Sequence, residues 1–383
     1  MVRKILALIT ALLVVGLPAV AEEVPRTGFE RTGQWTTFDE EQAFLTQISR
    51  KAAVSRIGST VQGRPLNLVR LGHGPTVLLF LCSQHGDEPA GREACLIKLR
   101  DLAYSRVPAG VTVLFVPTAN PDGREADTRG NANGVDINRD HMALDTPEGR
   151  AIAAVIRDYK PDVVHDLHEF GPTPLYYDKD VLWLWPRNLN ATQRVHDEAE
   201  ILSRQYIKPA VEVGGHTSGV YGIWTDPVTG EPIKQIAGDG QERILRNTAG
   251  LKHSLGLLVE TNISRTPQQR VQSHLSAVAA TFKLITERRV QVETATTLSR
   301  VTVPKQVYFD GADNQPPTQV APAPRAYTLT AEQYAQVKDK LILHGVWSVP
   351  WHDGRLVPVT QALVPLLLDG RAQFHLVAGT PTW

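Results

Sequence analysis

The sequence predicts an α/β fold built on a mixed, mostly parallel sheet. Two observations lead to this prediction: short continuous apolar runs, typical of strands covered on both faces, and helical stretches that alternate with them. The chain has 383 residues, 42% of them hydrophobic, which is enough for one large domain with a sizeable core. The predicted buried strands span residues 76–82, 111–117, 162–167 and 254–260.

The predicted elements follow one another in a regular order. Before the first buried strand, residues 57–72 predict two strands around the turn residues Gln62 and Gly63. Between the buried strands lie amphipathic stretches, one of which begins with Thr146 as a cap and Pro147 in its first turn. The predicted helices span residues 39–52, about 88–105, 146–159, 191–206 and 266–289.

Beyond about residue 290 the alternation stops. Residues 22–290 are predicted to form the main domain, and residues 291–383 a C-terminal extension that docks on it, because so short a segment rarely has a core of its own. Within the extension, residues 310–327 are rich in proline and predict a linker or surface loop. Residues 329–345 predict a further helix.

The first 21 residues have the pattern of a secretory signal peptide. Arg3 and Lys4 precede an apolar stretch, and residues 19–21 have the A-x-A form of a cleavage site, directly before Glu22. An uncleaved membrane anchor is the alternative interpretation. No later run reaches the ~18 apolar residues of a spanning helix. We therefore expect removal of residues 1–21 and an exported protein, periplasmic or extracellular, that is not attached to a membrane.

Charge and cysteine content exclude other classes of protein. Lys and Arg together number 40, as do Asp and Glu, so no net charge favours nucleic acid as a partner. The two cysteines, Cys82 and Cys95, form no disulfide framework and lack the spacing of a thiolate zinc site. We interpret them as two buried free thiols, with a disulfide as the alternative.

Two of the predicted strand ends carry histidines. His85 and Glu88 follow the first buried strand, and residues three apart at the start of a helix face the same way, so both can bind one ion. In the stretch HDLHEF, alternation along a strand sends His165 and His168 to opposite faces. His168 is the predicted ligand, because it lies at the carboxyl end of its strand, where open α/β sheets bind ligands.

A third strand end carries Glu260, in the stretch LLVETN. Two histidines, one glutamate and a water form a catalytic zinc set with an open position. A further carboxylate that does not bind the metal would act as general base, and Glu260 fits that role. Asp166 shares the face of His168 and is predicted to orient a neighbouring group. The sequence therefore predicts a zinc site at which His85, Glu88 and His168 meet.

The loop that follows the second buried strand contains the compact stretch GVDINRD. Arg139, with Asn138 beside it, is predicted to hold a carboxylate, because a guanidinium can bind both carboxylate oxygens at once. Together with this stretch, the chain resembles the zinc carboxypeptidases of the carboxypeptidase A superfamily (the M14 type), in an exported bacterial form, over about residues 40–290. The motifs that carry the resemblance, in chain order, are IGSTVQGRPL, QHGDEPAG, NPDG, GVDINRD, DLHEF and LLVETN.

The resemblance implies a fold and a reaction. The fold is an eight-stranded mixed sheet between helices, and the cofactor is one zinc ion per chain, bound by His85, Glu88 and His168. Glu260 would be the general base in hydrolysis of the C-terminal peptide bond of a peptide, protein-derived or from the cell wall.

The resemblance also assigns roles to the loop. Arg129 would polarise the scissile carbonyl, and Asp136 would fix the ring of His85 from behind. Asn138 and Arg139 would bind the free C-terminal carboxylate of the substrate.

Two departures from the family pattern leave alternatives open. Digestive members carry a tyrosine shortly before the catalytic glutamate, whereas the stretch AGDGQERILRN has none and Tyr221 is the nearest upstream. The short separation of His85 from His168 is also close to that of the succinylglutamate desuccinylase and aspartoacylase group. A zinc deacylase of N-acyl amino acids is therefore the alternative function, although export, IGSTVQGRPL and NPDG favour the carboxypeptidase. A non-catalytic binding module is disfavoured, since the set of ligands and base is complete.

The residue preference of such an enzyme does not follow from the sequence. The stretch before the strand of Glu260 normally supplies the pocket, and here it offers charges of both signs. These charged residues are Asp239, Glu242, Arg243 and Arg246.

Overall fold

A computed structural model gives the structure of the chain. The predicted signal peptide, residues 1–21, lies outside the described residues. Among the helices that are described, none is long and apolar enough to cross a membrane. The structure describes residues 23–172, 177–225, 228–229, 232–235 and 238–383.

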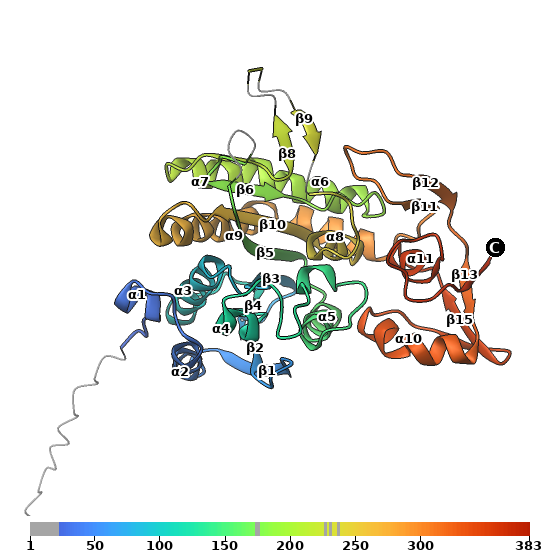
Figure 1. The fold of residues 1–383 in the computed structure, drawn as a ribbon, viewed down its shortest axis with the longest axis horizontal. Coiled ribbons are helices and arrows are strands. Elements are labelled where there is room, and N and C mark those ends of the chain that lie inside the picture. The colour runs from blue at the N-terminus through green and yellow to red at the C-terminus, as the bar shows by residue number, and fades with distance from the viewer. Residues whose placement is uncertain (1–22, 173–176, 226–227, 230–231, 236–237) are drawn as a thin grey trace, which may run out of the picture.

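An eight-stranded sheet forms the centre of the molecule (Figure 1). Its strand order is β1-β2-β4-β3-β5-β10-β6-β7, with parallel pairing along β4-β3-β5-β10 and between β6 and β7, and antiparallel pairing elsewhere. The prediction of a mixed, mostly parallel, eight-stranded sheet is confirmed. The strands are β1 Ala53–Ser59, β2 Pro65–Leu71, β3 Thr76–Cys82, β4 Val111–Val116, β5 Val163–Phe170, β6 Val181–Leu184, β7 Ser218–Val220 and β10 Leu255–Asn262.

Helices cover both faces of this sheet (Figure 1). Along β3, Leu78 and Phe80 belong to the core under α3 and α9, whereas Leu79 and Leu81 belong to the opposite core, with Ile152 of α5. A strand with both faces buried therefore reads as a continuous apolar run. The helices are α1 Gly28–Thr32, α2 Phe38–Ile48, α3 Ala90–Tyr104, α4 Pro121–Ala126, α5 Pro147–Tyr159, α6 Gln193–Ile201, α7 Lys208–Val213, α8 Leu245–Leu251 and α9 Pro267–Arg300, with a 3₁₀ turn at Ile137–Arg139.

Two predicted helices end elsewhere than expected. The helix predicted over 191–206 continues beyond α6 through a π-helical segment, Leu202–Ile207, into α7. The helix α9 continues past residue 289 to Arg300, with non-helical dihedral angles at Arg288. The domain boundary at residue 290 therefore falls within a helix, and the exact division of the chain stays a prediction.

The interpretation of the cysteines as free thiols is wrong. The structure joins Cys82, the last residue of β3, to Cys95 of α3 in a disulfide. Both residues are fully buried in the core between the sheet and α3. The side chains meet because α3 packs across the face of β3 to which Cys82 points, and sequence spacing does not reveal that crossing.

The C-terminal residues form strands as well as helices. The prediction of a linker or loop over 310–327 is wrong where β12 and the start of β13 lie. The ribbon of β11 and β12 tolerates Pro322 because each of its strands has an unpaired edge. The elements are β11 Gln306–Phe309, β12 Gln319–Pro322, β13 Ala326–Leu329, α10 Ala331–Leu343, β14 Val349–Trp351, β15 Gly354–Pro358, α11 Leu363–Leu368 and β16 Thr380–Thr382; a separate hairpin pairs β8 Ile223–Thr225 with β9 Pro232–Gln235.

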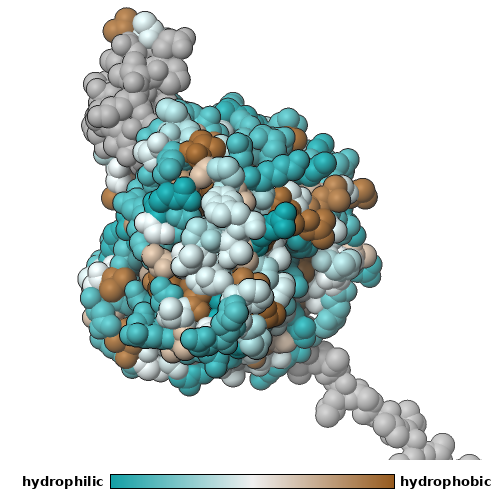
Figure 2. Space-filling model, turned by 90° about the vertical axis from the view of Figure 1, so that its right-hand side faces the viewer, coloured by the Kyte–Doolittle hydropathy of each residue, from teal (hydrophilic) through white to brown (hydrophobic). Residues whose placement is uncertain are grey.

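The C-terminal elements pack against the layers around the large sheet. Their core includes Tyr327 and Leu367, and it continues into the main domain through Met142 and Leu251. His344 donates a hydrogen bond of 2.9 Å from Nε2 to the carbonyl of Met142. The outer face of these elements is mostly hydrophilic, with hydrophobic residues in small separate patches (Figure 2).

Polar and aromatic contacts also tie the C-terminal elements to the main domain. Arg187 forms an ion pair of 2.5 Å with Asp313, and the indole of Trp185 donates to the same carboxylate at 2.8 Å. The guanidinium of Arg243 lies 4.3 Å from the ring centroid of Phe374. The segment that carries Arg243 is therefore held from the C-terminal side.

Candidate metal centre and active site

The site lies at the carboxyl ends of β3, β5 and β10. In the parallel pairing of β5 with β10, Glu260 is the register partner of His168, so the two residues lie side by side. His85 and Glu88 lie in the loop between β3 and α3. Parallel strands end at the same edge of a sheet, which is why three segments far apart in sequence meet here.

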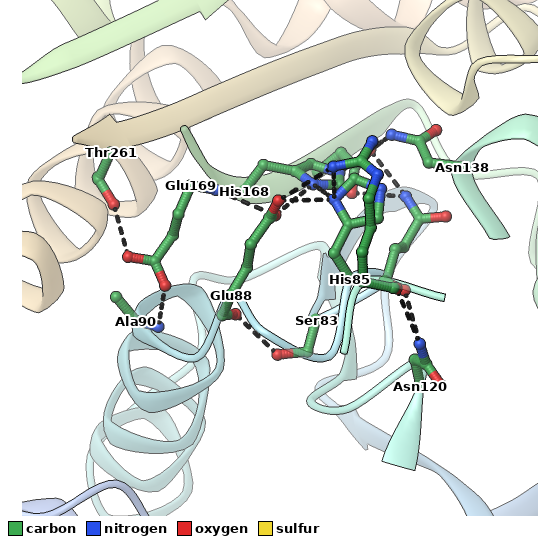
Figure 3. Close-up of polar contacts among 12 residues, drawn as sticks. Ser83, His85, Glu88, Ala90, Asn120, Asn138, His168, Glu169 and Thr261 are labelled. Carbon is green, nitrogen blue, oxygen red and sulfur yellow. Dashed lines mark hydrogen bonds and ion pairs between the residues drawn. The ribbon is translucent and has the colours of Figure 1, made fainter. Parts of the chain in front are cut away.

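The loop that carries His85 and Glu88 is tightly folded. Ser83 has a positive φ of 50°, and its hydroxyl donates to the carbonyl of Glu88 at 3.0 Å (Figure 3). A Cβ at Gly86 would lie 2.0 Å from the carbonyl carbon of Gly123, so the close approach of these two backbones needs glycine. This packing fixes the direction of both side chains.

The motif NPDG supports this loop from behind. The amide of Asn120 accepts from the backbone N–H of Gly123 at 2.9 Å and donates to the carbonyl of Gln84 at 3.2 Å. Asp122 accepts a hydrogen bond of 2.9 Å from Thr60, beside the turn between β1 and β2. In these contacts the motif connects the first hairpin to the loop before α3.

The three predicted metal ligands point toward one another (Figure 3). Nδ1 of His85 lies 2.7 Å from Oε1 of Glu88, and Nδ1 of His168 lies 2.8 Å from Oε2. The two Nδ1 atoms are 3.1 Å apart. One donor atom from each residue lies within 4.8 Å of the others, as one shared ion requires.

Each histidine has an acidic partner on its other ring nitrogen. Nε2 of His85 lies 3.1 Å from Asp136, and Nε2 of His168 lies 2.9 Å from Asp166. Carboxylates in this position hold Nε2 protonated and leave the lone pair of Nδ1 for a metal. Both outer partners are the residues that the sequence predicts, Asp136 from the resemblance and Asp166 from strand alternation.

This donor set fits zinc. With both Nε2 atoms protonated, two nitrogen lone pairs and a carboxylate face one another at 2.7–3.1 Å, and they repel unless a cation lies among them. Zinc binds histidine nitrogen and carboxylate oxygen at about 2.0–2.2 Å, and catalytic zinc sites use three protein ligands and leave one position open. The cofactor implied by the donor set is therefore Zn²⁺.

The carboxylates of the cluster favour a positive charge among its side chains. Burial alone would raise the pKa of Glu88, but His85 and His168 hold it well below its usual value. Burial would likewise lower the pKa of His168, but Asp166 and Glu88 hold it well above its usual value. A dication among these groups would satisfy the same preference.

His165 lies on the opposite face of β5, as strand alternation predicts. Its Nδ1 lies 3.1 Å from the hydroxyl of Thr281 on α9, and its ring packs beside Phe80 at a centroid distance of 5.5 Å. Burial lowers the pKa of His165 to about 3. His165 is therefore a neutral core residue that takes no part in the metal cluster.

Glu260 is buried beside the cluster. Burial raises the pKa of its carboxyl to about 7, with the neighbouring Glu88 carboxylate acting in the same direction. Tyr221 lines the same cavity, and its pKa is raised first by the Glu260 carboxylate and then by burial. The structure thus brings the nearest upstream tyrosine to the Glu260 side of the site.

Arg129 lies over the metal cluster, with 48% of its side chain exposed. Its Nη2 forms an ion pair of 2.9 Å with Asp136, and its Nη1 lies 3.2 Å from Nδ1 of His85. Its role toward a scissile carbonyl stays a prediction.

Asn138 and Arg139 lie in the loop after α4. The carbonyl oxygen of the Asn138 side chain accepts from the backbone N–H of Leu245 at 2.9 Å, and its nitrogen lies 3.2 Å from Nε2 of His168. Arg139 donates only to the carbonyl of Asn138, at 2.8 Å, among the described residues. Both line the cavity, and their contact with a substrate carboxylate stays a prediction.

Sequence reasoning missed a buried polar pair behind the ligands. Gln84 donates from its amide to both oxygens of Asp166 at 2.8 Å, and Nε2 of His141 lies 2.7 Å from the Gln84 carbonyl oxygen. A buried carboxylate such as that of Asp166 needs hydrogen-bond donors. The position of Gln84, a polar residue directly before His85, was therefore the signal that could have identified it. No signal in the sequence identified His141.

A cavity of about 640 Å³ opens in front of the cluster. The fold and the donor set together define a single-metal site at the carboxyl edge of an α/β sheet.

Residues 40–221 match the family described as zinc carboxypeptidase, Peptidase_M14. The match covers the motifs from IGSTVQGRPL to DLHEF, on which the resemblance to zinc carboxypeptidases rests. The match ends before Glu260 and before the arginines of the preceding stretch.

Relatives of known name are carboxypeptidases. Carboxypeptidase 2 of Trichophyton tonsurans is 30% identical over 189 residues, which are 46% of this chain and 35% of the relative. Carboxypeptidase SOL1 of Arabidopsis thaliana is 31% identical over 177 residues, which are 39% of this chain and 36% of the relative. The chain therefore spans about a third of the length of these relatives.

Solved structures share the fold at low sequence identity. A metallo-carboxypeptidase from Pseudomonas aeruginosa, in complex with (2-guanidinoethylmercapto)succinic acid, aligns with a TM-score of 0.51 and 19% identity over 65% of this chain and 69% of its own. Bovine thrombin-activatable fibrinolysis inhibitor aligns with a TM-score of 0.50 and 13% identity over 69% of this chain and 98% of its own. At these identities the likeness concerns the fold.

The two histidines of β5 give a matched test of the metal site. We expect His168→Ala to lose zinc, because it removes a ligand, and His165→Ala to keep it, because that ring faces α9. Zinc content of the purified variants, measured by elemental analysis beside circular dichroism, checks this. Equal zinc content in the two variants would show that the assignment of His168 is wrong.

Proposed function

We propose that this chain is a zinc-dependent carboxypeptidase that removes the last residue of peptides with a free C-terminal carboxylate. The observation that carries the proposal is the position of a buried glutamate, Glu260, beside a His–Glu–His cluster in a cavity lined by arginine. The family match and the names of the relatives support hydrolysis of peptides rather than of small N-acyl amino acids.

The residues of the site divide the work of hydrolysis. Zinc bound by His85, Glu88 and His168 would supply Lewis acidity toward water and the scissile carbonyl. Glu260, with a pKa raised to about 7 by burial, accepts a proton from the attacking water and returns it to the leaving amine. The OH of water thus ends on the carbonyl carbon and its proton on the nitrogen.

Two arginines would meet the substrate. Arg129, beside the ligand atoms, lies where it can stabilise negative charge on the carbonyl oxygen. Arg139 can offer the rest of its guanidinium to a terminal carboxylate, since it forms no ion pair among the described residues. Favourable binding of the free carboxylate by Arg139 would restrict cleavage to the chain end.

We also propose that the protein is exported. The basic start, apolar middle and A-x-A site of residues 1–21 support this. We expect a mature N-terminus near Glu22 in protein recovered from the periplasm or medium, measured by intact-mass spectrometry. Exported protein that retains Met1 would instead indicate a membrane anchor.

Replacement of the base tests the reaction. We expect Glu260→Gln to keep its zinc and its fold but to lose turnover by about 10²–10⁴-fold, because the isosteric amide cannot accept the proton. Steady-state release of the terminal residue from a blocked peptide checks this, with zinc content as the control. A variant that retains a third of wild-type kcat/KM would exclude Glu260 as the base.

A comparison of two enzymes on two substrates tests recognition of the chain end. Arg139→Lys keeps the charge but loses the two-pronged contact, so kcat/KM should fall by about 10–150-fold. Amidation of the substrate C-terminus should harm the wild type far more than this variant. Equal loss on amidation in both enzymes would mean that Arg139 does not bind the carboxylate.

A further inference from the structure

Three arginines of the cavity wall form no ion pair among the described residues. Arg139, Arg243 and Arg246 all line the cavity in front of the metal cluster. Within the part of the chain that the structure describes, none of these three arginines forms an ion pair. Arg129, in contrast, is paired with Asp136. One terminal carboxylate is enough to engage Arg139, which leaves Arg243 and Arg246 available to a second anion.

Arg246 is the most unusual of the three. Its residue is only 2% exposed, and it is among the largest fully buried side chains. Its Nη2 donates to the carbonyl of Asp239, whereas its buried Nε has no hydrogen-bond partner among the described residues. A buried guanidinium with an unused donor is costly, so this side chain favours a further acceptor supplied by a substrate.

The position of Arg246 is fixed by close packing. It lies in the first turn of α8, and a Cβ at Gly256 of β10 would lie 2.1 Å from the Arg246 carbonyl oxygen. The backbone of Arg246 thus lies directly against the strand that carries Leu258 and Glu260, and both of these residues line the cavity with Arg246. The cavity therefore extends from the base to a buried cation.

Charges of both signs surround Arg246. Burial lowers the pKa of Arg246 to about 10; the nearby Asp239 carboxylate opposes this shift, whereas Arg187 and Arg139 act in its direction. Burial also lowers the pKa of Arg243, followed by repulsion from Arg139. Arg139 thus repels both Arg243 and Arg246, and Asp239 attracts both, so a second substrate carboxylate would add a further anion to this wall.

We propose that the cavity selects peptides that end in an acidic residue, glutamate or aspartate, and that Arg246 binds the carboxylate of that side chain. This inference rests on the proposed carboxypeptidase function, with Arg139 at the α-carboxylate. Leu258 and Ile244 supply apolar surface for the methylene groups of the side chain.

Asp239 is the alternative determinant, because it would favour a basic terminal residue. Its carboxylate already accepts hydrogen bonds from the backbone N–H of Gln241 at 3.2 Å and from the Gln241 side chain at 2.7 Å. Asp239 is also partly exposed, so water stabilises its charge. Among the charged groups of the cavity, the buried Nε of Arg246 is therefore the one that can still donate a hydrogen bond to a substrate carboxylate.

The test compares three blocked peptides that differ only in a terminal Glu, Gln or Lys. Zinc-loaded wild type should prefer Glu over the isosteric Gln by about 10–150-fold in kcat/KM, the worth of a charge-assisted hydrogen bond. Arg246→Met should reduce this ratio to about 1 while still releasing Gln. Arg243→Met, which removes one positive charge from the same wall, is the matched control and should retain the preference.

The outcomes separate this inference from the proposed function. If wild type releases Gln or Lys as fast as Glu or faster, the acidic preference is wrong while the carboxypeptidase stands. If wild type releases no terminal residue from any peptide, the proposed function fails first. Should Arg246→Met not fold, judged by circular dichroism and zinc content, the wild-type comparison of Glu with Gln and Lys decides. If Asp239→Asn abolishes a preference for Lys, Asp239 is the determinant.

Discussion

The parallel pairing of β5 with β10 determines whether this site exists. It places Glu260 beside His168 in register, on the face of the sheet opposite to α9. A slip of one residue in either strand would turn its functional side chain to the other face, where His165 lies against Thr281. The loop after β3 then needs only to bring His85 and Glu88 over the end of β5. The geometry of the metal cluster is thus a consequence of strand register.

The alternation and burial of side chains along strands also explain how much of the molecule could be predicted. Buried strands give continuous apolar runs, and alternation along one strand was enough to separate His168 from His165. The disulfide of Cys82 with Cys95 could not be predicted, because it depends on how a helix crosses a strand. The C-terminal strands are short, lie in small sheets and contain proline, as at Pro322, so they show no regular alternation. Gln84 and His141 act only through a network that forms on folding.

The site combines two sets of groups that suit ligands of opposite charge. Around His85, Glu88 and His168, nitrogen and carboxylate donor atoms face one another. On the wall of the same cavity, Arg139 and Arg246 form no ion pair among the described residues, although Asp239 lies near Arg246. A dication suits the first set of groups and an anionic peptide end suits the second, and both ligands would lose water on binding.

The contact of Arg243 with Phe374 has a consequence for the order in which the site forms during synthesis. A ribosome makes the ligands, the base and Arg243 well before it makes Phe374, whose ring lies against the Arg243 guanidinium. This contact forms only after the later strands and helices have packed, by way of Asp313 and the shared core around Met142. A nascent chain thus carries the metal ligands and Glu260 before Arg243 has its contact with Phe374.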